Sequence, residues 1–288
     1  MNVVLTCLQH FQPCILINLQ QLIRLGHEHI YVITHRHLRE KFTLKHESIR
    51  LLFLEDVPPE EGRPFASELD ATFRHGFWLH TSYRFFAIRD CMRAYDIQDV
   101  IHLENDVLVY YHCDTLLPCL DKRFVYMPFD SLERNIASIV YIPDYHVLDR
   151  ILRYYNPAKD DMHNFRDIQQ KTNQIDHFPI CFPETNNPLR QFVTKNYDRF
   201  GGVLFDAAAM GQYIGGVDPD NHPHTSTSTV GFVNETCVVK YNQYRFVWIT
   251  SPCLKTLEDV KRPFLFHKGR KYPIFNLHIH SKQLAHFI

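Results

Sequence analysis

The segment VIHLENDVLVYY, residues 100–111, constrains the fold more than any other part of this chain. It is a run of β-branched and aliphatic residues, which is typical of a strand covered on both faces. Glu104, Asn105 and Asp106 interrupt that run. A buried charge is costly unless it is paired or bound to a metal, so these carboxylates need a positive partner. We therefore expect a buried strand that ends at a functional carboxylate pair.

Glu104 and Asp106 lie one residue apart, so their side chains project to the same side of an extended chain. Hard oxygen ligands in this arrangement suit Mn²⁺ or Mg²⁺, which keep several waters and complete their shell with substrate phosphates. Both residues are predicted metal ligands. The simpler interpretation is a strand that ends at an ordinary polar turn, and the C-terminal features described below favour the metal site.

Strands and helices alternate over the first part of the chain. We expect strands at residues 2–6, 30–34 and 51–54, and helices at 15–25 and 78–95, before the strand at residue 100. This order predicts an α/β fold with a mostly parallel, Rossmann-like central sheet flanked by helices. Ligands bind at the carboxyl ends of such strands, where Glu104 and Asp106 fall. From about residue 136 the pattern becomes irregular.

Composition narrows the class of protein. The chain has 288 residues, 45% of them hydrophobic, which suits one large domain or two small ones. A net charge of −1 without a Lys/Arg run gives no reason to expect a nucleic-acid partner. The eight cysteines show no C-x-x-C spacing and are expected to be reduced thiols. With no signal peptide or membrane span apparent, we expect a cytoplasmic protein; nothing indicates its oligomeric state.

The C-terminal segment NLHIHSK carries a second group of candidate ligands. If residues 274–280 form a strand, His278 and His280 share one face, and Lys282 follows on that face. One imidazole would complete the metal shell, while Lys282 would face a phosphate as a point charge. The sequence does not choose between the two histidines, and two ordinary strand histidines are the simpler interpretation.

Arg84 lies in the predicted helix at 78–95, some 20 residues before the carboxylates. If that helix packs beside the strand, its guanidinium reaches a phosphate or the sugar hydroxyls; a surface arginine is the alternative. Arg89 and Arg93, further along the same helix, are expected to face solvent.

Two further carboxylates are candidate bases. Asp206 lies in an apolar segment between the pairs Gly201-Gly202 and Gly215-Gly216, where glycine permits close backbone approach. Glu235 follows the polar loop at residues 218–229, which we expect to be mobile and to close over the donor. A carboxylate at such a junction can act as a general base. A glutamate that stabilises a helix N-terminus is the alternative for Glu235.

These residues together resemble a GT-A-type glycosyltransferase. The similarity rests on the aromatic-Arg helix (Tyr83, Arg84, Phe85), on LENDV as a variant D-x-D motif, and on the terminal strand with His and Lys. The resemblance implies that Asp106 chelates the metal, that Glu104 contacts the ribose or the metal, and that His278 or His280 is a further ligand. The donor contacts expected from it are Thr6, Arg84, Glu104, Asn105 and Lys282.

The resemblance also implies an activity: transfer of a sugar from a nucleotide-sugar, expected to be a UDP-sugar, to a hydroxyl of a glycan, a protein or a small molecule. Residues 1–112 would form the nucleotide-sugar-binding half of a single domain. Residues 113–288 would form the acceptor half with the metal/phosphate strand.

The sequence departs from the family pattern at two places: the first acid is Glu rather than Asp, and no Gly or Pro-Trp follows the histidines. Both an inverting and a retaining mechanism are compatible with the sequence. If the enzyme inverts, Glu235 is the first candidate for the general base and Asp206 the second. The rival classes are a metal-dependent phosphodiesterase and a non-catalytic sugar-nucleotide-binding module.

Overall fold

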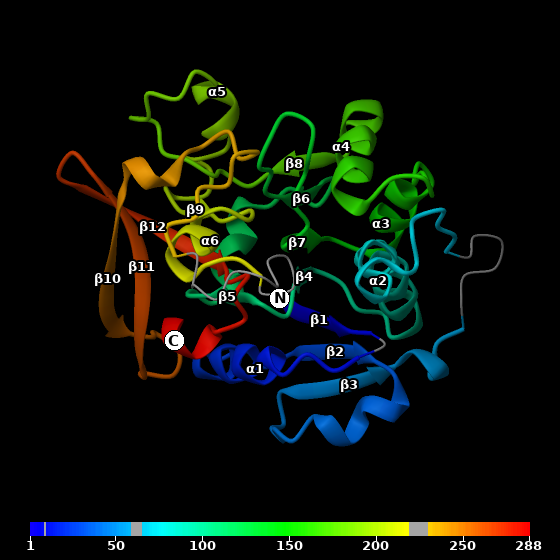
Figure 1. Ribbon diagram of the computed structural model, residues 1–288. Helices are drawn as coiled ribbons and strands as arrows, with labels where there is room; N and C mark the ends of the chain where they lie inside the picture. The colour runs from blue at the N-terminus through cyan, green and yellow to red at the C-terminus, as the bar shows by residue number, and fades with distance from the viewer. Residues whose placement is uncertain (9, 59–64, 219–229) are drawn as a thin grey trace.

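The computed structural model describes residues 1–8, 10–58, 65–218 and 230–288, and its main feature is a seven-stranded sheet (Figure 1). The strand order is β3-β2-β1-β4-β7-β6-β8. The strands are β1 (Asn2–Cys7), β2 (Ile30–Thr34), β3 (Ile49–Phe53), β4 (Val100–Leu103), β6 (Val125–Met127), β7 (Ile139–Ile142) and β8 (Ile175–His177). The pairs β3-β2, β2-β1, β1-β4 and β6-β8 are parallel, and β7 is antiparallel to both of its neighbours. The predicted mostly parallel α/β sheet is therefore confirmed.

The side chains of β1 alternate between the two faces of this sheet. Val3 and Leu5 belong to a core with Ile15 and Leu19 of helix α1 (Cys14–Arg24). Val4 belongs to the opposite core, which includes apolar residues of α2 (Phe77–Ala94), α3 (Tyr145–Leu152) and α4 (Asp161–Thr172). Helices thus cover both faces, which explains the near-continuous apolar sequence of β1 and β4.

A second, five-stranded sheet was not expected from the sequence (Figure 1). It has the order β10-β11-β12-β5, and β9 also pairs with β12. Its strands are β5 (Val107–Val109), β9 (Leu204–Phe205), β10 (Arg245–Pro252), β11 (Asp259–His267) and β12 (Arg270–His278). The segment at 100–111 is therefore two strands in two different sheets, separated by the turn that holds Glu104, Asn105 and Asp106.

Short helices complete the chain. They are α5 (Arg190–Val193), α6 (Met210–Gly215) and the 3₁₀ turns η1 (Arg36–Lys41), η2 (Leu54–Asp56), η3 (Phe73–His75), η4 (Cys113–Cys119), η6 (Tyr241–Gln243) and η7 (Leu284–Phe287). All eight cysteines are free thiols, and all but Cys119 are buried. Within the described ranges no helix is both long and apolar enough to cross a membrane.

The expectation that Arg89 faces solvent was wrong. Arg89 is 1% exposed in α2, and its guanidinium lies 2.8 Å from Asp90 and 3.6 Å from Asp149. Helices α3 and α4 pack on α2 in addition to the sheet, so more than one side of α2 is buried. An arginine on a buried side of a helix is stable there only when carboxylates pair with it.

Candidate functional site

Glu104, Asp106 and His278 form the one group of three metal-ligand residues found in the part of the chain that the structure describes. Each offers a ligand atom, and these atoms lie within 4.8 Å of one another. Glu104 directly follows β4, so the group lies at the carboxyl end of a parallel strand, where the fold class places ligands. The structure thus brings the carboxylate pair and the C-terminal strand together.

The second sheet positions the histidine. Strand β12 runs antiparallel to β5, with His278 opposite Val107. The Ile279 amide then donates to the Asp106 carbonyl at 2.8 Å. This register fixes the end of the C-terminal strand beside a turn that lies some 170 residues earlier in the sequence.

The ring of His278 is oriented as in a metal ligand. Its Nδ1 donates to the Ala207 carbonyl at 2.9 Å, and its Nε2 lies 3.1 Å from Glu104 Oε2 and 3.3 Å from Asp106 Oδ1. A hydrogen bond from one ring nitrogen to a backbone carbonyl is how metal-binding histidines are usually held. Burial alone would lower the pKa of His278, but Asp106 and Glu104 raise it to about 9. His278 Nε2 thus faces the space between the two carboxylates.

Lys282 also reaches the site. Its ammonium forms an ion pair with Asp106 and lies 4.0 Å from Asp218. Burial opposes ionisation of Asp106, yet Lys282 and His278 hold the pKa of that carboxyl well below its ordinary value. Asp106 is thus an anion that lies between two cations.

Arg84 is buried, and not a surface residue. Its guanidinium bridges Glu104 and Asp161, with 2.9 Å to the Asp161 carboxylate. Burial raises the pKa of Asp161 to about 6, although Arg84 opposes the shift. Because both carboxylates hold it, Arg84 orients Glu104, and we find no support in this geometry for a direct phosphate contact.

The carboxylate turn is fixed by a buried polar side chain from α1. Asn18 Nδ2 donates to the Val107 carbonyl at 2.9 Å and to the Glu104 and Asn105 carbonyls at 3.3 Å each. Asn105 in turn donates from its side chain to the Thr6 carbonyl at 2.9 Å. Thr6 and Asn105, both expected at the donor, are joined here by a hydrogen bond that ties the turn to the end of β1.

His280 lies behind His278 and not against the carboxylates. The two rings are 4.0 Å apart, and Gln212 Nε2 donates to His280 Nδ1 at 3.0 Å. Burial and the neighbouring His278 hold the pKa of His280 well below its ordinary value. The structure therefore favours His278 over His280 as the ligand.

Asp206 accepts four backbone hydrogen bonds. The donors are the amides of Ala209, Met210 and Gly211, at 2.9, 2.9 and 2.7 Å, and the amide of His278 at 2.9 Å. Both carboxylate oxygens are therefore occupied by backbone amides. This geometry favours a structural role, in which Asp206 joins the start of α6 to the end of β12.

Glu235 is exposed, in contrast to the buried cluster. Its carbonyl accepts from Lys240 Nζ at 2.7 Å. The neighbouring Asn234 donates from its side chain to the Ala208 carbonyl at 3.2 Å, which ties this loop to the segment before α6. Apart from Asp218, the loop expected to close over the donor lies outside the described residues.

Several residues that shape the site were not found from the sequence. Asn18 and Gln21 could have been identified, because they lie three residues apart in an apolar helix, and two buried amides on an apolar face need nearby backbone partners. The roles of Asp161 and Gly211 could not have been predicted from sequence, because they depend on contacts across the fold.

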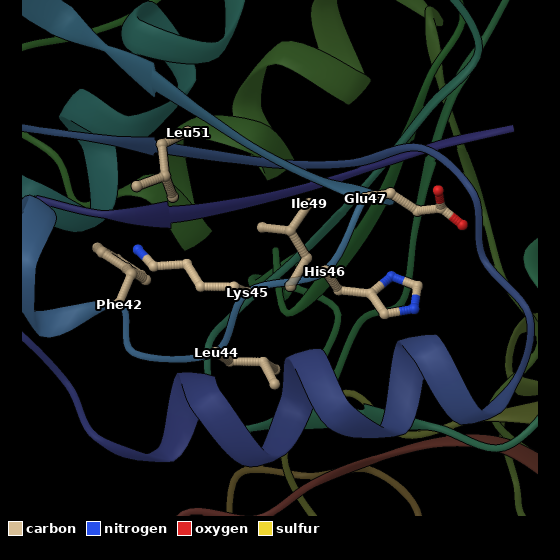
Figure 2. A pocket seen from close by; sticks show the side chains of 7 residues that line it. All are labelled: Phe42, Leu44, Lys45, His46, Glu47, Ile49 and Leu51. Carbon is tan, nitrogen blue, oxygen red and sulfur yellow. The ribbon is translucent and has the colours of Figure 1, made fainter.

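A separate hollow of about 400 Å³ lies beside the edge strand β3 (Figure 2). Phe42, Leu44, Ile49 and Leu51 supply its apolar wall, and Lys45, His46 and Glu47 supply charged or polar groups. None of these residues belongs to the carboxylate cluster, so we assign the chemistry to the cluster and not to this hollow.

No family model and no curated protein sequence matches this chain. Among solved structures it is similar to an active-site mutant of LgtC (12% identity, TM-score 0.43, covering 67% of this chain and 83% of that one). It is also similar to mouse xyloside xylosyltransferase 1 in its apo form (9%, 0.41, 67% and 92%). A third is the bifunctional glycosyltransferase WbbM in its apo form (17%, 0.42, 62% and 38%).

Proposed function

We propose that this protein is a metal-dependent glycosyltransferase that moves a sugar from a nucleotide-sugar, a UDP-sugar in the first instance, to a hydroxyl acceptor. The observation that carries the proposal is the convergence of Glu104, Asp106 and His278 at the carboxyl end of β4, with Lys282 against Asp106. Two carboxylates and one imidazole leave room for phosphate oxygens and water in an octahedral shell.

The donor set fits Mn²⁺ or Mg²⁺. The His278 Nδ1 bond to Ala207 leaves Nε2 directed at the carboxylates, and that nitrogen becomes a ligand when it loses its proton. When bound, the ion would stabilise the charge that develops on a departing diphosphate. Lys282 adds a further positive charge at the same place, and Arg84 holds Glu104 in position.

We assign the donor nucleotide to residues 1–112, and the acceptor to residues 113–288, whose C-terminal strand also supplies the metal and phosphate contacts of His278 and Lys282. If the reaction inverts, Glu235 is the general base. Exposure leaves the Glu235 carboxylate accessible to an acceptor hydroxyl, whereas Asp206 is held by four amides. Replacing Glu235 by Gln should lower transfer by about 10²–10⁴-fold and leave donor affinity unchanged. Transfer within a few-fold of wild type, together with retained anomeric configuration, would exclude a base at this position.

The decisive experiment compares Asp106→Asn with the parent against a panel of nucleotide-sugars, with and without Mn²⁺. We expect loss of metal-dependent turnover of about 10³-fold, because the metal supplies several kcal/mol of transition-state stabilisation. Asp121→Asn is the matched control, because this half-buried carboxylate pairs with Arg123, two residues away, and does not belong to the cluster. Near-parental turnover in Asp106→Asn contradicts the proposal. Hydrolysis that no acceptor stimulates would indicate a phosphodiesterase, and donor binding without turnover would indicate a binding module.

A further inference from the structure

A chain of alternating charges leads from the candidate metal site to the start of α2. Asp106 pairs with Lys282, Lys282 lies 4.0 Å from Asp218 Oδ2, and Arg74 Nη2 donates to that same oxygen at 2.7 Å. One carboxylate oxygen therefore lies between two cations. The Asp218 side chain is 8% exposed and that of Arg74 is 20% exposed, so the pair is largely shielded from water.

The backbone that presents Arg74 is strained. Arg74 (φ 45°), His75 (φ 56°) and Gly76 (φ 80°) are three consecutive residues in the left-handed region, which only Gly adopts without cost. Strain of this kind persists where surrounding contacts enforce it, and it is concentrated at functional sites. The Arg74 guanidinium also lies 4.6 Å from the ring centre of Phe77, which limits its directions further.

The topology puts this turn on the correct side of the sheet. Strands β3 and β4 both run in the direction of β1. Helix α2 ends shortly before β4 begins, so its end lies at the amino edge of the sheet and its start lies toward the carboxyl edge. Arg74 lies just before α2, at the edge that also carries Glu104 and Asp106. Arg84, in contrast, lies within the helix and is committed to Glu104 and Asp161.

We propose that Arg74 and Lys282 together bind the diphosphate of the donor, and that Asp218 occupies this anion site in the ligand-free molecule. This inference rests on the proposed function. It adds Arg74 to the donor site, together with an exchange of the Asp218 carboxylate for phosphate oxygens. With a cation held by Asp106, the charge that pairs with Lys282 would be offset, and the Lys282 ammonium would be available to the phosphates. Arg74 exchanges the Asp218 carboxylate for phosphate oxygens, which its planar donors match well.

Binding measurements by titration calorimetry test this exchange. The ligands are UDP and inorganic pyrophosphate, each with Mn²⁺, and uridine, which lacks phosphate. We expect Arg74→Ala to weaken UDP and pyrophosphate by about 10–100-fold, as for loss of a hydrogen bond to a charged group, and to leave uridine unchanged. Parental affinity for both phosphate ligands in this variant overturns the proposal.

Arg123→Ala is the matched control. Arg123 also pairs with one aspartate, Asp121, and its guanidinium also lies near a phenylalanine ring, that of Phe124 at 5.5 Å, but it is exposed. It should bind all three ligands as the parent does. A loss of UDP affinity equal to that of Arg74→Ala would show that the effect is general electrostatics and would overturn the specific assignment.

Asp218→Asn gives a result of opposite sign. Removing the competing charge should strengthen binding of UDP and pyrophosphate several-fold, because the phosphates no longer displace an anion. If Asp218 only holds Arg74 in place, the same change weakens binding, and that outcome overturns the exchange.

Fluorescence supplies an independent readout. The chain has two tryptophans, Trp78 and Trp248. In Trp248→Phe the emission comes from Trp78, whose ring packs edge-on against Phe77 beside the Arg74 guanidinium. Mn²⁺-UDP should shift this emission, and Arg74→Ala in the same background should abolish the shift. A shift that survives Arg74→Ala counts against the exchange.

The two variants distinguish a wrong role for Arg74 from a wrong proposed function. If Asp106→Asn abolishes Mn²⁺-dependent UDP binding while Arg74→Ala does not change it, the metal site stands and only the role of Arg74 is wrong. If Asp106→Asn also leaves binding unchanged, the proposed function is wrong.

Discussion

Gly211 packs directly against the peptide of His278. A Cβ on Gly211 would lie 2.0 Å from the His278 carbonyl oxygen and 2.5 Å from its carbonyl carbon. No side chain fits in that space, so only glycine allows α6 to approach the end of β12 this closely. The position of the candidate metal ligand thus depends on a residue that itself offers no ligand atom.

We predict that Gly211→Ala weakens Mn²⁺ binding and destabilises the fold. The added methyl group meets backbone, which cannot rotate away, so β12 or α6 must shift, and overpacking typically costs about 1–3 kcal/mol. Mn²⁺ affinity and the free energy of unfolding in urea measure the two effects. Gly215→Ala in the same helix is the control, because its Cβ would meet the ring edge of Phe287 at 3.1 Å, which can move. Equal behaviour of the two variants would refute the role assigned to Gly211.

The two C-terminal histidines should differ in their effects on metal binding. His278→Ala removes the nitrogen that faces Glu104 and Asp106. We expect Mn²⁺ affinity to fall at least 10–100-fold, the range found even for residues that only hydrogen-bond to a metal ligand. His280→Asn retains a polar partner for Gln212 and should change affinity only a few-fold. Paramagnetic resonance of Mn²⁺ measures both. A larger loss in His280→Asn than in His278→Ala would reverse the assignment.

Arg84 and Asp161 should show strong energetic coupling. Replacing Arg84 by Met leaves Asp161 and Glu104 without their shared cation, and removal of one member of a buried pair costs about 3–5 kcal/mol. Asp161→Asn in the Arg84→Met background removes one stranded charge and should recover part of that loss. Urea unfolding of the two single variants and the double variant gives the coupling energy. Additive losses would contradict the bridge.

Local sequence pattern predicts the elements that local interactions determine. Helix α1, strand β2 and the mostly parallel first sheet follow from periodicity, and the charges in 100–111 mark the turn where the carboxylates lie. Alternation does not distinguish His278 from His280, because it places both on one face. The choice follows from the end of β12 at His278 and from its pairing with β5, which are tertiary contacts.

Arg84 and Asp206 show the same limit. An arginine in a helix and an aspartate between glycines have many possible partners, and only the packing of α2 on α4 and of α6 on β12 selects them. The second sheet was missed because its strands β10 and β11 carry mixed polar and apolar residues and pair with each other, antiparallel, over eight positions.

His27 provides a test of stability against pH. Its ring is 2% exposed, stacks on His112 at 4.1 Å, and has no hydrogen-bond partner for either nitrogen among the described residues. Burial, with a smaller contribution from His112, lowers the pKa of His27 to about 3. The unfolded chain, with an ordinary histidine pKa near 6.5, therefore binds a proton that the native state excludes. Stability from this group is complete above pH 6.5 and is lost as the pH falls below it.

The difference between the pKa of His27 in the folded and in the unfolded chain sets how much the free energy of unfolding changes with pH. At pH 5.5, one unit below the unfolded pKa, this single histidine should lower the free energy of unfolding by about 1.4 kcal/mol relative to pH 8. His27→Phe keeps a flat ring in the stack but takes up no proton, so the difference between urea unfolding at pH 8 and pH 5.5 should shrink by that amount. His29→Phe changes an exposed ring two residues away and should leave the difference as it is in the parent. An unchanged pH dependence in His27→Phe would mean that the native state accommodates a charged His27 at little cost.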